Sequence, residues 1–243
     1  MPRFKLTIEY NGTRYSGWQI QKNARTVAGE LERAIREVTR AKKLELYGSG
    51  RTDAGVHAIA QVAHLDIATT LPPETLRRRV NDELPVDINV LSVEIASHRF
   101  HARHDAVGRR YLYQISRRRT AFHKPFVWWV RDELDLGRMR DAAALFTGLQ
   151  DFRSFTDDEP DDKSTKVHVE RIDISERDDL ILIRIDGSHF LWKMVRRIVG
   201  VLVEAGRGSL TLDEIGKMLG QTSGAPARLT APASGLFLEK VSY

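Results

Sequence analysis

The chain has 243 residues, of which 42% are hydrophobic and 29% are charged, and it contains no cysteine. A chain of this length and composition can bury a sizeable core, which argues against disorder. The lack of cysteine excludes disulfide frameworks, thiolate nucleophiles, cysteine-bound zinc and iron–sulfur clusters. No apolar run approaches the roughly 20 residues that span a bilayer, and the first residues lack a signal-peptide core, so we expect a cytoplasmic protein with no membrane partner.

The charges are unevenly distributed along the chain. Lysine and arginine number 38 against 33 acidic residues, a net charge of +5. Arginines cluster at 77–79, 109–110, 117–119 and 196–197, whereas acidic residues concentrate at 157–162. Clustered cations favour a polyanionic partner such as nucleic acid. Solvated protein surfaces carry similar clusters, so charge alone leaves both interpretations open.

The first half of the chain alternates strand and helix patterns. Residues 4–10 alternate like a strand, and 26–40 repeat apolar residues with the spacing of one helix face. The pattern then predicts a strand at 44–47, a glycine-rich loop at 48–55, a strand at 56–67, a helix from Pro72 and Pro73 to 84, and a strand at 88–95.

The second half repeats this order with longer elements. We expect a strand at 111–115, a helix at 136–146, a hairpin of 167–175 with 180–186, an apolar helix at 190–203, a short helix at 212–219 and a strand at 236–241. Two similar β-α-β-β-α-β halves predict an α+β fold with a central mixed or antiparallel sheet covered by helices. The pattern leaves open whether the two sheets merge, and the lack of a flexible linker favours one continuous sheet shared by the halves. The halves are placed at 1–100 and 101–243.

The loop at 48–58 has the densest local pattern. It holds Asp53, Arg51 and His57 among three glycines. It is not a phosphate loop or a dinucleotide fingerprint, because the Gly-Lys-Ser/Thr ending, the third glycine and a following helix are all missing. Glycines here let a substrate approach the backbone closely. An aspartate in such a turn also bonds its own backbone, so pattern alone leaves a structural role for Asp53 open.

Other chemical motifs are weaker. His98, His101 and His104 are three residues apart on an extended segment, which does not converge on one metal ion, so no metal is expected. The acidic run at 157–162 lacks the glycine and terminal glutamate of a calcium loop and is interpreted as a surface loop. Trp128 and Trp129 fit either a core position or a base-stacking platform.

Two further segments place arginines beside tyrosines or on an apolar helix. Tyr111 and Tyr113 share one face of a predicted strand, directly after Arg109 and Arg110. Before any family is considered, the pattern favours a core tyrosine with its hydroxyl at the rim. Arg196 lies on the apolar helix, where a buried cation needs an anionic partner such as Asp53, a phosphate or another carboxylate.

These motifs together resemble the tRNA pseudouridine synthase A family. GRTDAGVHA at 50–58 is similar to its active-site signature, and four flanking motifs follow in the family's order: YSGWQIQ at 15–21, FHAR at 100–103 with RYLY at 110–113, MVRRIVG at 194–200, and TAPA at 230–233. The likeness spans nearly the whole chain. It departs from the family's usual residues at Ala60, His104, Asp105 and the pair 192–193, which bears on substrate contacts rather than on the chemistry.

The resemblance implies an isomerase of the pseudouridine synthase fold, an α+β fold with a cleft between the two halves. It implies conversion of uridine to pseudouridine at positions 38, 39 and 40 in the anticodon stem-loop of tRNA, by a homodimer that needs no cofactor or metal. The target nucleotide has to be extruded from its stack to reach the enzyme. Contacts to phosphates then supply most of the affinity for the folded RNA, which suits clustered arginines.

Residue roles follow from the same resemblance. Asp53 carries over as the nucleophile, because a covalent intermediate on the base or the sugar divides a difficult exchange into two steps. Arg196 is expected to pair with the Asp53 carboxylate, Arg51 to hold the flipped nucleotide or its phosphate, and Tyr111 to stack on the target base. Arg109 and Arg110 are expected to bind the RNA.

Two other functions remain to be weighed against the isomerase. A non-catalytic tRNA-binding module would use the same arginines without turnover. A glycosidase with paired carboxylates is disfavoured, because the signature loop holds no second Asp or Glu.

Overall fold

The computed structural model describes residues 1–158 and 164–243. The chain divides into two compact units, Met1–Val107 with Phe237–Tyr243, and Gly108–Leu236. The sequence pattern predicts a boundary after residue 100, whereas the compact units divide after Val107 and the last strand belongs to the first unit. Within the described residues, no helix combines the length and apolar character needed to cross a bilayer.

The first unit contains every element that the sequence predicts for it. These are β1 (Arg3–Tyr10), α1 (Val27–Thr39), β2 (Leu44–Gly48), β3 (His57–Ile67), α2 (Pro73–Glu83) and β4 (Ile88–Ala96), with a 3-10 turn η1 at Gly12–Arg14 and the late strand β10 (Leu236–Ser242). The strand order is β4-β1-β3-β10, and β2 pairs with β3. Strand β10 runs parallel to β3, while the other pairs are antiparallel.

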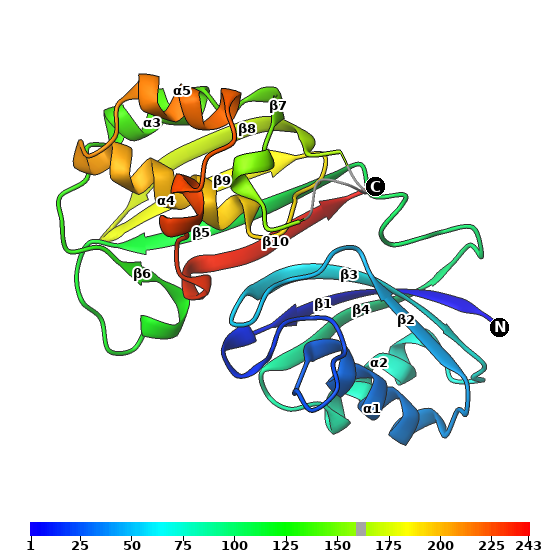
Figure 1. Ribbon diagram of the computed structural model, residues 1–243. Coiled ribbons are helices and arrows are strands. Elements are labelled where there is room, and N and C mark those ends of the chain that lie inside the picture. Colours follow the sequence, from blue (N-terminus) through cyan, green and yellow to red (C-terminus); the bar gives the residue numbers. More distant parts are fainter. Residues whose placement is uncertain (159–163) are drawn as a thin grey trace. The chain divides into compact units, whose positions relative to one another are not determined.

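Helix α1 shows how local sequence produces this unit. The Thr26 hydroxyl accepts a hydrogen bond from the Gly29 backbone N–H and caps the first turn. Val27, Leu31 and Ile35 are fully buried on one face. Helices α1 and α2 lie beside each other on one face of the strands (Figure 1), and α2 packs on β4.

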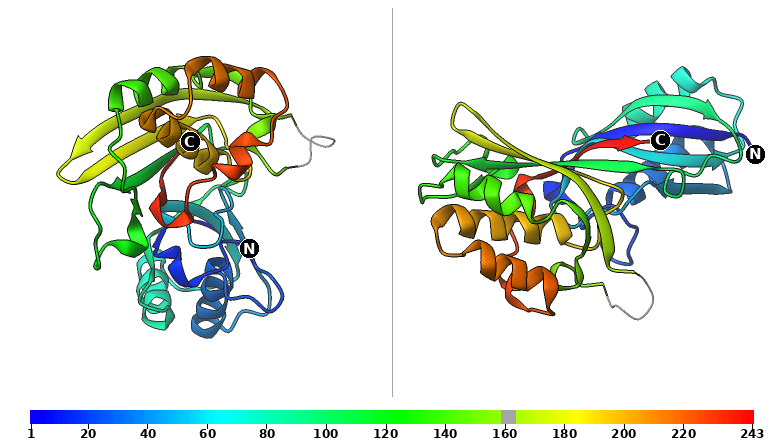
Figure 2. Two further views of the ribbon diagram at one scale, coloured as in Figure 1. Left: turned by 60° about the vertical axis from the view of Figure 1, so that its left-hand side comes forward. Right: turned by 90° about the horizontal axis from the view of Figure 1, so that it is seen from above.

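The second unit is a mainly antiparallel sheet covered by helices on one face (Figure 2). Its strands are β5 (Gly108–Ser116), β6 (Trp128–Trp129), β7 (Gly148–Asp151), β8 (Lys166–Arg177) and β9 (Leu180–Gly187). Its helices are α3 (Leu136–Ala144), α4 (Met194–Arg207), α5 (Leu212–Gly220) and α6 (Ala225–Arg228), with 3-10 turns η2 (Lys124–Phe126), η3 (Arg153–Phe155) and η4 (Ala233–Gly235). The order is β5-β9-β8-β7, and β6 is parallel to β5. The predicted α+β class with mixed strand pairing is confirmed.

One predicted helix is shifted along the sequence. The apolar pattern predicts a helix at 190–203, but α4 begins at Met194 and ends at Arg207. Lys193 adopts a left-handed conformation with φ of 63°, so residues 190–193 form a loop rather than a first helical turn. Gly208, also at positive φ, ends the helix by donating its N–H to the Ala205 carbonyl.

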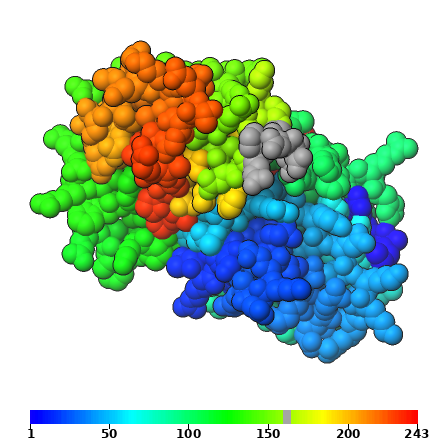
Figure 3. Space-filling model, in the orientation of Figure 1, coloured from blue at the N-terminus to red at the C-terminus, as the bar shows by residue number. Residues whose placement is uncertain are grey.

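The sequence patterns do not predict the shortest elements. Strands β6 and β7, the helix α6 and the 3-10 turns are too brief to develop a period. The segment from α5 to η4, coloured orange to red, lies at the surface of the second unit in the space-filling view (Figure 3).

Candidate active-site residues

The loop between β2 and β3 is anchored at its start by buried polar groups. Ser49 donates from its hydroxyl to Gln61 Oε1 at 2.7 Å and from its backbone N–H to the Val62 carbonyl at 2.7 Å. Gln61 donates from Nε2 to the Gly50 carbonyl at 3.0 Å. Because Ser49 and Gln61 are both almost fully buried, these bonds hold the loop's first residues to strand β3.

Thr52, directly before Asp53, is held from two sides. Its hydroxyl lies 2.8 Å from the Tyr10 hydroxyl in a buried contact with β1. Its carbonyl accepts a hydrogen bond from the Trp18 backbone N–H at 3.1 Å. The segment after β1 therefore crosses the loop and restrains the backbone that carries the aspartate.

Gly17 allows this crossing. Its φ is +89°, and a Cβ there would lie 2.5 Å from the Thr52 carbonyl oxygen and 3.2 Å from the Asp53 carbonyl carbon. Only glycine fits both the conformation and the space. On the other side of Asp53, the Val56 N–H donates to the Asp53 carbonyl at 3.1 Å and Gly55 adopts a φ of +79°, which closes a turn.

His57 has a structural role in this loop. It is almost fully buried, and its Nδ1 accepts a hydrogen bond from the Gly12 N–H at 3.0 Å. Its ring stacks on Phe237, with centroids 4.6 Å apart. The imidazole of the signature therefore holds the start of β3, while Asp53 is half-buried and Arg51 is exposed.

Tyr111 and Tyr113 share the helix-covered face of β5, opposite Ile185 and Ile183 in the neighbouring strand. Tyr113 is fully buried, and its hydroxyl donates to the Pro232 carbonyl at 2.8 Å. Tyr111 is half-buried and meets Phe190 edge-on, with ring centroids 5.2 Å apart. Tyr113 is thus a core residue, whereas part of Tyr111 stays accessible.

Arg109 and Arg110 point to opposite faces of β5, as neighbours on a strand do. Arg109 donates from Nη1 to the Ser188 carbonyl at 3.0 Å, at the end of β9. Arg110 donates from Nε to Asp186 Oδ1 at 2.6 Å. The two predicted RNA-binding arginines therefore do not form one continuous contact on this strand.

Arg196 is positioned by the segment that precedes β10. Its Nε donates to the Ala231 carbonyl at 2.7 Å, and the Ala231 N–H donates to the Arg196 carbonyl at 3.0 Å. Gly200 makes this possible, because a Cβ there would lie 1.6 Å from the Leu229 carbonyl oxygen. The missing side chain at Gly200 lets residues 229–231 lie against α4 and orient the Arg196 guanidinium.

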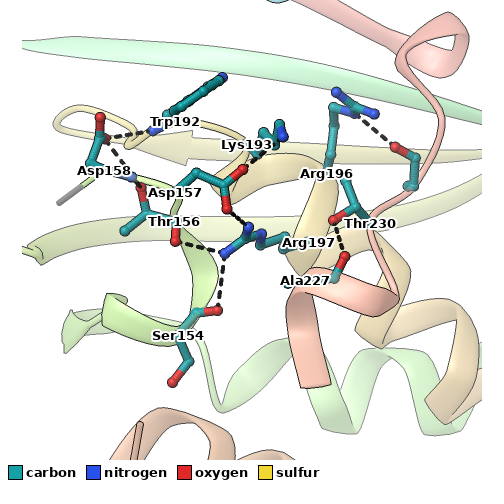
Figure 4. A network of polar contacts seen from close by, with 11 residues as sticks. Ser154, Thr156, Asp157, Asp158, Trp192, Lys193, Arg196, Arg197, Ala227 and Thr230 are labelled. Carbon is teal, nitrogen blue, oxygen red and sulfur yellow. Dashed lines mark hydrogen bonds and ion pairs between the residues drawn. The ribbon is translucent and has the colours of Figure 1, made fainter. Parts of the chain in front are cut away.

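Arg197 differs from its neighbour Arg196. It is 4% exposed and forms an ion pair with Asp157 inside the second unit (Figure 4). Other arginines of the predicted clusters are in surface ion pairs: Arg77 with Glu74, Arg117 with Glu176, and Arg118 with Asp179. Exposed pairs exchange partners at little cost, but a buried arginine is removed from any RNA contact.

The structure adds positioning contacts that sequence reasoning missed. Tyr10 belongs to the alternating pattern of β1, and Ala231 to the TAPA motif, but nothing in either pattern indicates a bond to Thr52 or Arg196. The expected pairing of Arg196 with Asp53 stays a prediction. Across residues 1–158 and 164–243, no group of three or more His, Asp or Glu side chains is arranged to hold a metal ion. Of the acidic run, residues 159–162 lie outside the described residues.

Comparison with known proteins yields one family. The family model described as tRNA pseudouridine synthase matches residues 6–105 and 142–243. A protein named tRNA pseudouridine synthase A from Rhodopseudomonas palustris strain BisA53 is 41% identical over 246 residues and covers 100% of both chains. One of the same name from strain BisB18 is 42% identical with the same coverage. A Clostridium tetani protein named tRNA pseudouridine synthase A 2 is 37% identical over 98% of both chains.

Proposed function

Because this chain belongs to the tRNA pseudouridine synthase family, we propose that it converts uridine to pseudouridine at positions 38, 39 and 40 of the tRNA anticodon stem-loop, with Asp53 as its nucleophile. The observation that carries this proposal is the Asp53 turn. A half-buried carboxylate sits on a backbone that Trp18, Gly17 and Thr52 restrain. Holding a reacting group in a fixed geometry lowers the entropic part of the reaction barrier.

The proposed reaction is an isomerisation with balanced atoms. The bond between uracil N1 and the ribose C1′ breaks, and a bond between uracil C5 and C1′ forms. The proton on C5 leaves, and N1 gains one, so no oxidant, reductant or cofactor is consumed. A carboxylate that bonds transiently to the base or the sugar holds the fragments together while the uracil turns.

The other site residues take supporting roles in this proposal. Tyr111 stacks on the target base, which suits a half-buried aromatic ring. Arg196 directs the carboxylate of the nucleophile, and the Ala231 carbonyl holds its Nε in place. Arg51, which is exposed, binds the flipped nucleotide or its phosphate, and Arg109 and Arg110 contribute to RNA affinity.

The decisive experiment compares wild-type protein with Asp53→Asn on unmodified tRNA, with pseudouridine mapped by position. We expect wild-type product at positions 38 to 40, no product from Asp53→Asn, and tRNA affinity within about threefold of wild type, because the exchange removes one charge on a fixed turn. The matched control is Asp178→Asn, an exposed aspartate at φ 53° in the β8–β9 turn, where asparagine is equally acceptable.

Each alternative has its own outcome. Tight tRNA binding by the wild type without any pseudouridine would favour the non-catalytic binding module. Release of free uracil without pseudouridine would favour a glycosidase. Product at wild-type yield from Asp53→Asn would reject the assigned nucleophile.

The proposal extends to assembly and binding. We infer a homodimer located in the cytoplasm, as the sequence resemblance implies, and sedimentation of the purified chain tests the oligomeric state. Because arginine contacts to phosphates release counterions, we expect tRNA affinity to fall by at least about tenfold between 50 and 200 mM salt. An affinity that does not change with salt would contradict a phosphate-contacting surface.

A further inference from the structure

The turn that joins β9 to α4 presents an exposed indole on a restrained backbone. Trp192 is 50% exposed, and the next residue, Lys193, is held at φ 63°. A left-handed conformation at a residue other than glycine or asparagine is costly and persists only where surrounding contacts impose it. The turn is therefore held by something other than its own sequence.

Two carboxylates from the segment after η3 hold the turn (Figure 4). Asp158 accepts a hydrogen bond at Oδ2 from the Trp192 backbone N–H, at 2.9 Å. The Lys193 ammonium donates to Asp157 Oδ2 at 2.7 Å. One contact fixes the backbone of the turn, and the other fixes the side chain that follows it.

Arg197 anchors this arrangement from inside the unit. Its guanidinium donates to the other oxygen of Asp157, and its Nη1 donates to the carbonyls of Thr156 at 2.7 Å and Ser154 at 3.3 Å. The Asp157 carboxylate thus bridges a buried cation and Lys193. The Lys193 hydrogen bond and the nearby Arg197 charge hold the pKa of Asp157 below its usual range, so the bridge stays ionised at neutral pH.

The exposed indole has the properties of a base-stacking surface. The Lys193 ammonium lies 4.9 Å from the Trp192 ring centroid. An exposed ring on a restrained backbone loses little conformational entropy when a nucleobase stacks on it, and every base offers a π-face. The same loop contributes Phe190, whose ring contacts Tyr111, the residue assigned to the target base.

We propose that Trp192 stacks on an unpaired nucleobase of the tRNA substrate, and that Asp157 and Asp158 are positioning residues that hold its turn. This inference rests on the proposed function for its substrate. It adds a second base contact beside the one assigned to Tyr111, carried by the loop directly before α4.

The first experiment measures tRNA affinity and steady-state kinetics for Trp192→Ala, Trp192→Leu and Trp192→Phe. We expect the alanine and leucine variants to raise the dissociation constant and KM about tenfold with kcat retained, and phenylalanine to stay within about threefold of wild type. Leucine keeps apolar bulk without a π-face, so it separates stacking from simple burial. Leu149→Ala, which removes another exposed apolar side chain of the second unit, is the matched control and is expected to match wild type.

A second experiment locates the base. Anticodon stem-loop RNAs that each carry one abasic nucleotide are bound to wild-type protein and to Trp192→Ala. At the stacked position the two losses are not additive, because each removes the same contact, whereas at other positions they add. Additive losses at every loop position would overturn the stacking of Trp192 on a loop base.

The positioning role of Asp158 is tested by measuring KM in two variants. Asp158→Ala is expected to raise KM about threefold, and Asp158→Asn to restore it, because an amide oxygen still accepts the Trp192 N–H. Equal KM values for both variants and wild type would overturn this role.

Two results would reject the stacking proposal as a whole. One is an unchanged tRNA affinity in Trp192→Ala. The other is a loss of affinity that accompanies dissociation of a dimer in sedimentation, which would assign the indole to contact with a second copy of the chain. Pseudouridine formation by the wild type tests the proposed function separately, since the binding measurements do not depend on turnover.

Discussion

The hydroxyl oxygens of Tyr10 and Thr52 lie 2.8 Å apart in the interior of the first unit, so strand β1 is bonded directly to the residue before Asp53. Removal of the Tyr10 hydroxyl leaves the Thr52 hydroxyl buried without this hydrogen bond, which lowers the free energy of unfolding by about 1 kcal/mol. We expect Tyr10→Phe to lower kcat about tenfold through misplacement of the turn while tRNA affinity is unchanged. Single-turnover kinetics with saturating enzyme measure the step, and an unchanged rate would show that β1 does not position Asp53.

Gly17 provides a stronger test of the same restraint. Gly17→Ala places a Cβ against the Thr52 carbonyl in a conformation that alanine resists, so we expect a loss of about 1 to 3 kcal/mol in unfolding free energy and a large loss of activity. Gly216→Ala in α5, where a Cβ meets nothing within 4 Å, is the control and is expected to stabilise by about 0.5 to 1 kcal/mol. Chemical denaturation measures both changes, and a neutral Gly17→Ala would contradict the close approach.

The two consecutive arginines of α4 are expected to separate function from stability. Arg196→Lys loses the Nε donor to Ala231 and the planar guanidinium, so we expect kcat to fall about 100-fold or more with a small change in melting temperature. Arg197→Lys loses contacts to Thr156, Ser154 and Asp157 in the interior, and we expect about 2 to 4 kcal/mol of destabilisation.

Thermal unfolding and activity at a temperature where both variants are folded measure this contrast. A stable but inactive Arg197→Lys, or an active Arg196→Lys, would reverse the assignment of the two side chains.

Because of the buried His64, we expect the free energy of unfolding to depend on pH. His64 is 1% exposed, and its Nδ1 accepts a hydrogen bond from the Ala102 N–H at 3.1 Å. Burial, with the Arg3 and His101 charges nearby, lowers its pKa from 6.5 to about 4. The folded state therefore favours neutral His64, so its contribution is complete above pH 6.5 and is lost as the pH falls towards 4, because the unfolded chain binds the proton first.

We expect protonation of His64 to lower the free energy of unfolding by about 1 to 2 kcal/mol over that interval, a value that includes screening by nearby solvent. In His64→Asn the amide oxygen still accepts the Ala102 N–H but does not titrate, so the slope between pH 6.5 and 4 should decrease. His98→Asn, which replaces an exposed histidine, is the control. An equal slope in wild type and His64→Asn would assign the pH dependence to other groups.

Much of the fold could be predicted from the sequence because short-range patterns determine it. Thr26 before an apolar helix face predicts α1, and the alternation from Phe4 to Tyr10 predicts β1. The start of α4 could not be predicted in this way, since the apolar run begins at Phe190 but that ring packs on Tyr111 of strand β5.

In the candidate site, too, some features depend on adjacent residues and others depend on how the chain packs. The sequence by itself determined the family, the α+β class and the position of Asp53 in a glycine-lined turn, since each depends on residues that are adjacent along the chain. Only the tertiary structure decided that Tyr10 bonds Thr52, that Ala231 orients Arg196, and that Arg197 is buried while its neighbour is not. Those contacts join residues 35 to 42 positions apart, and their geometry arises only when the chain packs.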